Sequence, residues 1–217
     1  MSDLSLIPFA LKLPDRTLVD VSEVDRGRGC QCVCPSCETP LIAKKGDVKE
    51  WHFAHDSKVD SPSTKKECEY SFWVSVVRMA KVLIRQTETL TLPAHKMYSN
   101  EGKEFTVSKK TRIEVDSAKI VQRVGNLSVD AIVVSHGHSI AISFTAPHRK
   151  NNQKIETDNK EISSVLEISL NAAKDWFYQD KIKGEYKKTL RNAVIDSSDN
   201  KMWRVHARQK FIEKKYN

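Results

Sequence analysis

Four of the five cysteines in this chain of 217 residues lie within eight positions, and this cluster constrains the fold more than any other feature. It opens the segment CQCVCPSCETPLIAKKGDVKEWHFAH (residues 30–55), which ends with two of the seven histidines. Cys34 and Cys37 form a C-x2-C pair, and His52 and His55 form an H-x2-H pair. Two thiolates and two imidazoles complete a tetrahedral ligand set for zinc. Because so short a segment buries little apolar surface, we expect a structural zinc ion to stabilise it.

The ligand set has alternatives. Cys68 could replace one histidine and give a Cys3His site, whereas Cys30 and Cys32 lie too near the C-x2-C pair to add a second site easily. Buried free cysteines with solvent-facing histidines are another interpretation, but two x2-spaced pairs of different ligand types rarely arise by accident. Glu50 could serve as the base of a catalytic zinc site, yet two full ligand pairs favour a closed structural site.

The positive charge of the chain is concentrated near its C-terminus. The formal net charge is +8 and the pI is near 9.2, and residues 181–217 hold eight Lys and three Arg against two Asp and two Glu. Such a basic face attracts phosphate backbones without recognising sequence, although ordinary surface lysines on a solvated helix would give the same composition. The candidate nucleic-acid contacts are Lys187, Lys188, Arg191, Arg204 and Arg208.

The sequence also indicates the cellular compartment in which the protein is expected. No apolar run approaches the ~20 residues that a membrane-spanning helix needs. The N-terminal twenty residues contain two prolines and no basic n-region, so they are expected to form a strand rather than a signal peptide. An odd number of cysteines argues against a closed disulfide set. We therefore expect a cytoplasmic protein with no membrane partner.

Hydrophobic periodicity predicts an alternation of strands and helices. Helical spacing marks a buried helix that begins near Tyr70 and ends before Leu90. Strands are expected within residues 5–24, 104–116, 127–135, 139–146 and 165–170, a polar segment that can hold a helix at 151–164, and a helix-rich tail from about Ala172. The predicted domains are the N-terminal strands and zinc-binding module (1–68), an α/β core (69–171) and a basic helical C-terminal segment (172–217).

A family resemblance follows from the cysteine-rich segment. RGRGCQCVCPSCETPLIAKKGDVKEWHFAH, followed by Cys68, resembles the N-terminal part of the competence protein CoiA family. Shared features are a glycine before a C-x-C-x-C-P-x-C run, a hydrophobic hairpin, H-F-A-H and a further cysteine. The resemblance implies a fold of the α+β or α/β class, in which a small zinc-ribbon-like module precedes a restriction-endonuclease-like mixed sheet of αβββαβ order. It also implies a role in DNA processing or in handling foreign DNA.

The nuclease motif that this resemblance implies is incomplete. A PD-(D/E)XK site needs an aspartate and a second acid for a divalent metal such as Mg²⁺, plus a lysine that acts on the water. Asp130 occupies the first position, but Ser143 and Thr145 occupy the acid and lysine positions. Glu167 and Lys154 are the candidates for a migrated acid and a migrated base. Further candidates for a migrated base or a phosphate contact are His148, Arg149 and Lys150.

Three functional classes follow, and the sequence leaves open whether the chain is an enzyme. The favoured hypothesis is a zinc-containing nucleic-acid-binding protein, with DNA as its partner and a catalytically degenerate nuclease-type fold. The second is an active nuclease that uses Mg²⁺, Asp130 and Glu167. The third is a zinc-stabilised adaptor whose partner is another protein. Salt-dependent DNA binding separates the first two from the third, and metal-dependent cleavage separates the second from the first.

Overall fold

The structure, a computed structural model, describes residues 6–58, 68, 70–99, 101–124, 127–147, 149, 162–178 and 183–216. The chain divides into two compact units, and each combines segments that are distant in sequence. The first unit consists of Met1–Val82, Ala146–His148 and Leu170–Arg191. The second unit consists of Leu83–Thr145, Arg149–Ser169 and Asn192–Asn217. The three domains expected from the sequence (1–68, 69–171 and 172–217) remain a prediction.

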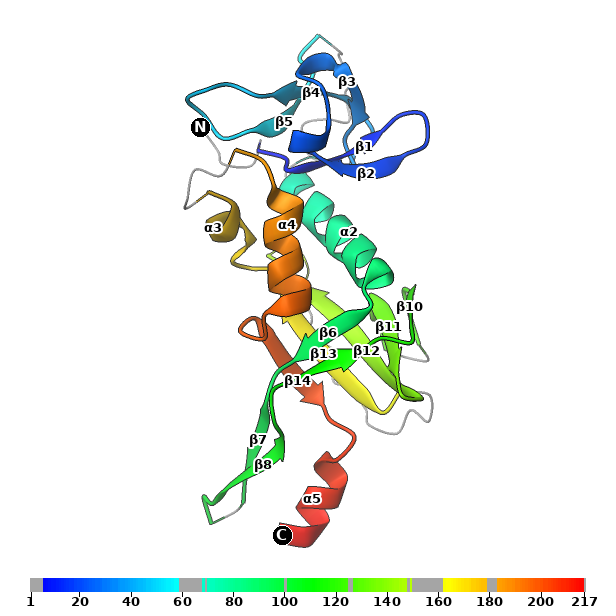
Figure 1. Ribbon diagram of the computed structural model, residues 1–217, viewed down its shortest axis with the longest axis vertical. Coiled ribbons are helices and arrows are strands. Elements are labelled where there is room, and N and C mark those ends of the chain that lie inside the picture. Colours follow the sequence, from blue (N-terminus) through cyan, green and yellow to red (C-terminus); the bar gives the residue numbers. More distant parts are fainter. Residues whose placement is uncertain are drawn as a thin grey trace. The chain divides into compact units, whose positions relative to one another are not determined.

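The first unit contains an antiparallel five-stranded sheet in the order β2-β1-β3-β4-β5 (Figure 1). Its strands are β1 (Phe9–Lys12), β2 (Thr17–Asp20), β3 (Gly27–Val33), β4 (Pro40–Lys44) and β5 (His52–His55). Beyond β5, the backbone of Ile7 exchanges hydrogen bonds of 3.2 and 2.7 Å with that of Phe53. Ile7, two residues before β1, thus covers the outer edge of β5. The two short strands expected within residues 5–24 are confirmed as β1 and β2.

Aromatic side chains join this sheet to the helices of the same unit. These helices are the N-terminal part of α2 (Ser71–Gln86), α3 (Ala173–Tyr178) and α4 (Tyr186–Arg191), with a short 3-10 turn η2 (Val21–Glu23) after β2. The buried ring of Phe177 lies 6.0 Å from Phe9, 6.0 Å from Phe72 and 5.0 Å from Tyr186, measured between ring centroids. Aromatic burial of this kind contributes strongly to a core. The unit is therefore held together by residues more than 160 positions apart in the chain.

A buried carboxylate fixes the start of α4 beside β2. Asp20 is 1% exposed, and its carboxylate accepts hydrogen bonds from the backbone N–H groups of Ser22 (2.9 Å) and Lys187 (2.7 Å). Gly184, just before α4, has a φ of +87°, and a Cβ atom there would lie 2.8 Å from the Cβ of Ser22. A side chain at this position would clash, so only glycine lets the two segments approach so closely.

The second unit contains a mixed five-stranded sheet in the order β10-β11-β12-β13-β14. Its strands are β10 (Ser117–Ile120), β11 (Ala131–Ser135), β12 (His138–Thr145), β13 (Ser164–Ser169) and β14 (Lys201–Val205). Strands β12 and β13 are parallel, and the other neighbouring pairs are antiparallel. His136 and Gly137 form the tight two-residue turn between β11 and β12, with φ values of 48° and 75°.

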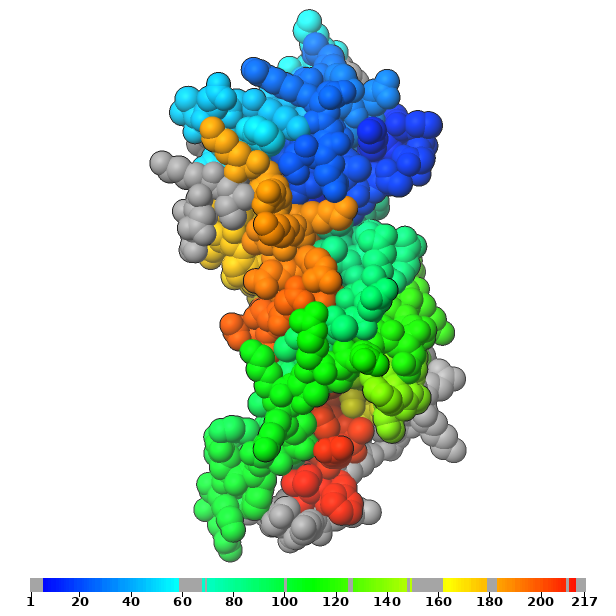
Figure 2. All heavy atoms as spheres, viewed as in Figure 1, coloured from blue at the N-terminus to red at the C-terminus, as the bar shows by residue number. Residues whose placement is uncertain are grey.

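Smaller elements complete the second unit. Strand β6 (Thr89–Leu92) pairs with β9 (Thr111–Glu114), and β7 (His95–Tyr98) pairs with β8 (Glu104–Ser108). A π-helical turn η3 (Asn192–Asp196) precedes β14, and α5 (Gln209–Tyr216) follows it. The β7–β8 hairpin forms an exposed green surface in Figure 2, and Tyr98 on it is 66% exposed. Within the described part of the chain, no helix is long and apolar enough to cross a membrane.

The predicted central helix is confirmed as α2. Residues that recur along it at helical spacing are buried, namely Phe72, Val76, Met79, Ala80 and Leu83. The strand expected within residues 165–170 is likewise confirmed as β13. The helix considered for residues 151–164 falls mostly outside the described residues.

Two sequence predictions need correction. The tail from Ala172 is not helical throughout, because it contains β14, in which Lys201 and Trp203 are buried while Met202 and Arg204 are exposed. Because one of the buried residues is the lysine Lys201, the sequence does not show the alternation of apolar and polar residues that marks a strand. In addition, the strand that precedes β11 in the sheet is β10, not the 104–116 segment, which forms β8 and β9 instead. Strand β10 is mostly exposed, so its apolar pattern is weak.

Candidate metal centre

The C-x2-C pair lies in a tight turn between β3 and β4. The backbone N–H of Cys34 donates to the carbonyl of Thr39, and the N–H of Glu38 donates to the carbonyl of Cys34, both at 2.9 Å. Glu38 takes a φ of 62°, which reverses the chain. The N–H of Ser36 points at the sulfur of Cys34, 3.4 Å away, as suits a thiolate ligand. Backbone hydrogen bonds thus hold both thiols on the same side of the turn.

Two further candidate metal ligands, His55 and Cys68, come from β5 and from the residues just before α2. His55 is the last residue of β5 and pairs in register with Leu41 of β4. Cys68 lies just before α2, and its carbonyl accepts a hydrogen bond of 3.1 Å from the backbone N–H of Ser71. The helix start therefore fixes the position of the Cys68 backbone next to the sheet. All of these segments belong to the first unit.

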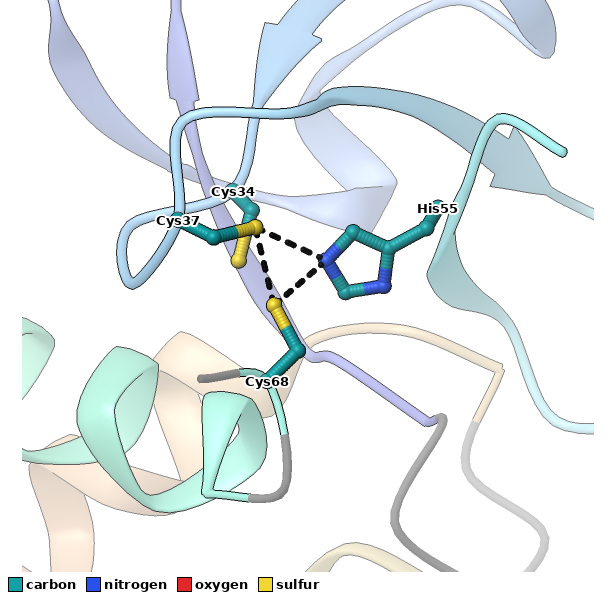
Figure 3. A group of neighbouring side chains, drawn as sticks. All are labelled: Cys34, Cys37, His55 and Cys68. Atoms are coloured by element: carbon teal, nitrogen blue, oxygen red, sulfur yellow. Dashed lines mark hydrogen bonds between the residues drawn. The ribbon is translucent and has the colours of Figure 1, made fainter. Parts of the chain in front are cut away.

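Cys34, Cys37, His55 and Cys68 form one compact cluster (Figure 3). Their donor atoms all lie within 4.8 Å of one another. The Cys68 sulfur is 2.8 Å from the Cys37 sulfur and 3.1 Å from Nε2 of His55, and the Cys37 sulfur is 3.4 Å from the same nitrogen. Ligand atoms around a tetrahedral zinc ion are separated by roughly 3.8 Å. Three thiols and one imidazole in this arrangement can hold a metal such as zinc.

The local electrostatics suit metal binding. Burial raises the pKa of the Cys34 thiol. Burial also acts to raise the pKa of Cys37, but hydrogen bonds with Cys68 and Thr39 outweigh it, so the pKa of Cys37 is lowered. Burial lowers the pKa of His55, which keeps its imidazole neutral and able to donate a lone pair. Burial alone disfavours the charged thiolates, and the positive charge of a bound divalent cation would offset this cost.

His52, which the spacing favoured as the fourth ligand, is not part of this cluster, and Cys68 takes that place. The reason is the strand itself: side chains alternate between faces, so two residues three positions apart point to opposite sides. His55 shares a face with buried Phe53, whereas His52 points to the other face. Nδ1 of His52 donates to the carbonyl of Glu50 at 2.8 Å instead.

The two remaining cysteines lie apart from the cluster on β3. Cys30 and Cys32 are 1% and 3% exposed. The thiol of Cys30 donates to the carbonyl of Leu41 at 3.3 Å, and that of Cys32 donates to the carbonyl of Cys30 at 3.1 Å. Both side chains therefore contribute to the packing and hydrogen bonding of the sheet and not to the cluster.

The nuclease-motif aspartate lies in the second unit, directly before β11. The side chain of Asp130 is 2% exposed. Its Oδ2 accepts a hydrogen bond of 2.8 Å from the backbone N–H of Phe144 on β12, and it lies 3.0 Å from Nη1 of Arg149. One carboxylate oxygen thus completes the hydrogen bonding of β12 and also neutralises an arginine.

The second candidate acid is also paired with arginine. Glu167 of β13 lies in register with Ser143 of β12 and with Met202 of β14, so a neutral serine stands beside it in the sheet. Its Oε2 is 3.6 Å from Nη1 of Arg204, and its side chain is 15% exposed. The pairing of Asp130 with Arg149 and of Glu167 with Arg204 was missed from the sequence, because neither pair has a diagnostic spacing. Lys154 lies outside the described residues.

The five cations proposed to contact nucleic acid do not lie in one unit. Lys187, Lys188 and Arg191 belong to the first unit, and Arg204 and Arg208 belong to the second. Lys187 pairs with Glu23 at 3.0 Å, and Lys188 pairs with Glu185 at 3.3 Å. The basic C-terminal segment of the sequence is thus divided between the two units.

Comparison with known families finds a match over part of the segment that carries the metal cluster. The family model of the competence protein CoiA, N-terminal domain, matches residues 18–64. This match spans strands β3, β4 and β5 and includes three of the four clustered residues, ending before Cys68. Searches of the curated proteins and of the solved structures found no match.

Proposed function

Because residues 18–64 match the CoiA N-terminal domain, we propose that this chain is a zinc-containing nucleic-acid-binding protein. It acts on DNA, either in DNA processing or in the handling of foreign DNA. Its second unit is a nuclease-type domain that no longer cleaves. The observation that carries this proposal is that the family match coincides with a cluster of three thiols and one imidazole.

Zinc is the metal that the donor set favours. Soft thiolate ligands with one imidazole in a tetrahedral arrangement select zinc over oxygen-preferring ions such as Mg²⁺. Four protein donors leave no open coordination position for a substrate. The ion is therefore structural: it joins the C-x2-C turn to the end of β5 and to the start of α2.

The element order of the second unit supports a nuclease-type origin. Along the chain, helix α2 is followed by the short strands β6 to β9, then by the antiparallel strands β10, β11 and β12, and then by β13 parallel to β12. The order and directions of β10 to β13 agree with those of the four strands in an αβββαβ core. Asp130 stands at the start of the second of these strands, where the motif expects its first acid.

Charge pairing argues against divalent-metal catalysis in this unit. A Mg²⁺ site gathers uncompensated carboxylate oxygens at one point. Here Asp130 is neutralised by Arg149 and Glu167 by Arg204, with neutral Ser143 beside Glu167. Two arginines would have to leave before a cation could be held by both acids.

DNA binding is tested by a titration of the zinc-loaded chain with fluorescently labelled single-stranded and double-stranded oligonucleotides at several salt concentrations. We expect an affinity that falls steeply with salt, because each phosphate contact releases counterions. The net charge of +8 makes this electrostatic contribution favourable. Absence of binding at low salt would contradict the proposal and would favour an adaptor whose partner is a protein.

A further inference from the structure

The face of the first sheet that carries His52 also carries a basic side chain on the neighbouring strand. Lys44 of β4 is paired with His52 of β5. Side chains directly opposite one another in a sheet project from the same face, about 5 Å apart. Lys44 and His52 therefore stand side by side, on the face opposite to the metal cluster.

Both residues line a groove of about 660 Å³ that is formed by the β4–β5 hairpin and the segment at the start of β3. Arg26, which immediately precedes β3, and Lys49, between β4 and β5, line the same groove. Four cationic side chains line the groove, against two acidic ones, Asp47 and Glu50. Lys45 is committed to the fold, because its ammonium group donates to the carbonyl of Ser22 and lies 4.9 Å from the centre of the Trp51 ring. The cations left to face solvent are those of Arg26, Lys44 and Lys49.

These three cations have no carboxylate partner among the residues that the structure describes. By contrast, Lys187, Lys188 and Arg204 each pair with a glutamate. The charges of Lys44 and Lys49 also reach His52: after burial, they contribute to lowering the pKa of its imidazole, against the opposing effect of Glu50. The groove thus holds a local excess of positive charge that the protein itself does not neutralise.

We propose that this groove, formed by Arg26, Lys44, Lys49 and His52, binds the phosphate backbone of nucleic acid. The inference rests on the proposed function and gives it a location. Three exposed cations lie along one open groove, which matches an extended polyanion better than a single compact anion. His52 lines the groove, but its Nδ1 proton is already donated to the Glu50 carbonyl, so the cations supply the attraction for phosphate.

The test compares two triple variants in the oligonucleotide titration. The groove variant carries Arg26→Gln, Lys44→Gln and Lys49→Gln. The control variant removes the same charges from exposed residues outside the groove, with Arg123→Gln, Lys12→Gln and Lys119→Gln. We expect the groove variant to lose affinity by about tenfold or more and to lower the salt slope by about 2 to 3, whereas the control stays close to the parent.

The outcomes separate this inference from the function on which it rests. If the parent binds nucleic acid and the groove variant binds equally well, the groove is not the site and the proposed function stands. If both triple variants lose the same affinity, the effect is one of net charge and the groove assignment fails. If the parent binds no nucleic acid, both proposals fail. Unchanged zinc content in both variants verifies that the module remains folded.

Inorganic pyrophosphate distinguishes a nucleic-acid backbone from a small phosphate ligand. Several cations along one groove gain affinity from several phosphates on one strand, so pyrophosphate at the same phosphate concentration should leave the labelled oligonucleotide bound. Full displacement under that condition would identify a small-phosphate site and overturn the assignment to nucleic acid.

Discussion

Replacement of His55 by asparagine is expected to abolish stoichiometric zinc binding, whereas the same replacement at His52 should leave one zinc ion per chain. His55 is within reach of Cys37 and Cys68, while His52 lies on the opposite face of β5. Structural zinc contributes on the order of 10–16 kcal/mol in small zinc-dependent modules. Loss of the ion should therefore unfold the cysteine-rich segment. Metal analysis of the purified variants, together with thermal unfolding, measures both effects.

The reverse pattern would contradict this ligand set. Zinc lost from His52→Asn but kept in His55→Asn would indicate a different arrangement of the segment. Cys68→Ser gives a second check, because Cys68 is the ligand that the H-x2-H spacing alone does not favour. We expect Cys68→Ser to lose zinc and Cys30→Ser to retain it, since the Cys30 thiol donates to the Leu41 carbonyl outside the cluster.

Asp130→Ala is expected to lower the free energy of unfolding by about 2–3 kcal/mol. The substitution leaves the buried N–H of Phe144 without its acceptor and removes the partner of Arg149. Glu167→Ala is the matched control. Its ion pair is longer, and Arg204 is 38% exposed, so we expect a cost below about 1 kcal/mol.

Urea unfolding of the two variants measures this difference. Catalytic carboxylates are commonly held at a cost to stability, so their removal often stabilises a protein. Equal or greater stability of Asp130→Ala would therefore indicate a strained functional acid and would count against the structural role. A clear loss of stability supports an aspartate that now completes the sheet.

Much of the first unit's chemistry could be predicted from residue spacing. The C-x2-C pair could be recognised in the sequence because a tight turn brings the thiols of residues i and i+3 together. Cys68 could be named as a further candidate ligand. The choice between the two histidines needed the knowledge that H-F-A-H is a strand. In a helix, residues three apart share a face, whereas in β5 they do not. The same x2 spacing therefore brings the two cysteines of the turn together but places the two histidines of β5 on opposite faces of the sheet.

The second unit was harder to predict because its decisive contacts are tertiary. Arg149 and Glu167 were both identified as candidate site residues, but their partners depend on which strands are neighbours. Strand β14 escaped prediction because buried Lys201 donates to the carbonyls of Thr91 and Ile195, an arrangement that a hydrophobic pattern does not show. Helix α2, with buried residues at regular helical spacing, was predictable for the opposite reason.

The fate of end-labelled DNA incubated with the zinc-loaded chain and Mg²⁺ or Mn²⁺ tests the central claim, binding without cleavage, most directly. Binding is monitored by mobility in a native gel, and the same samples are analysed for length under denaturing conditions. We predict that the DNA is bound and remains full length, with the parent and with Asp130→Ala alike. Metal-dependent shortening by the parent that Asp130→Ala abolishes would contradict the account and establish an active nuclease.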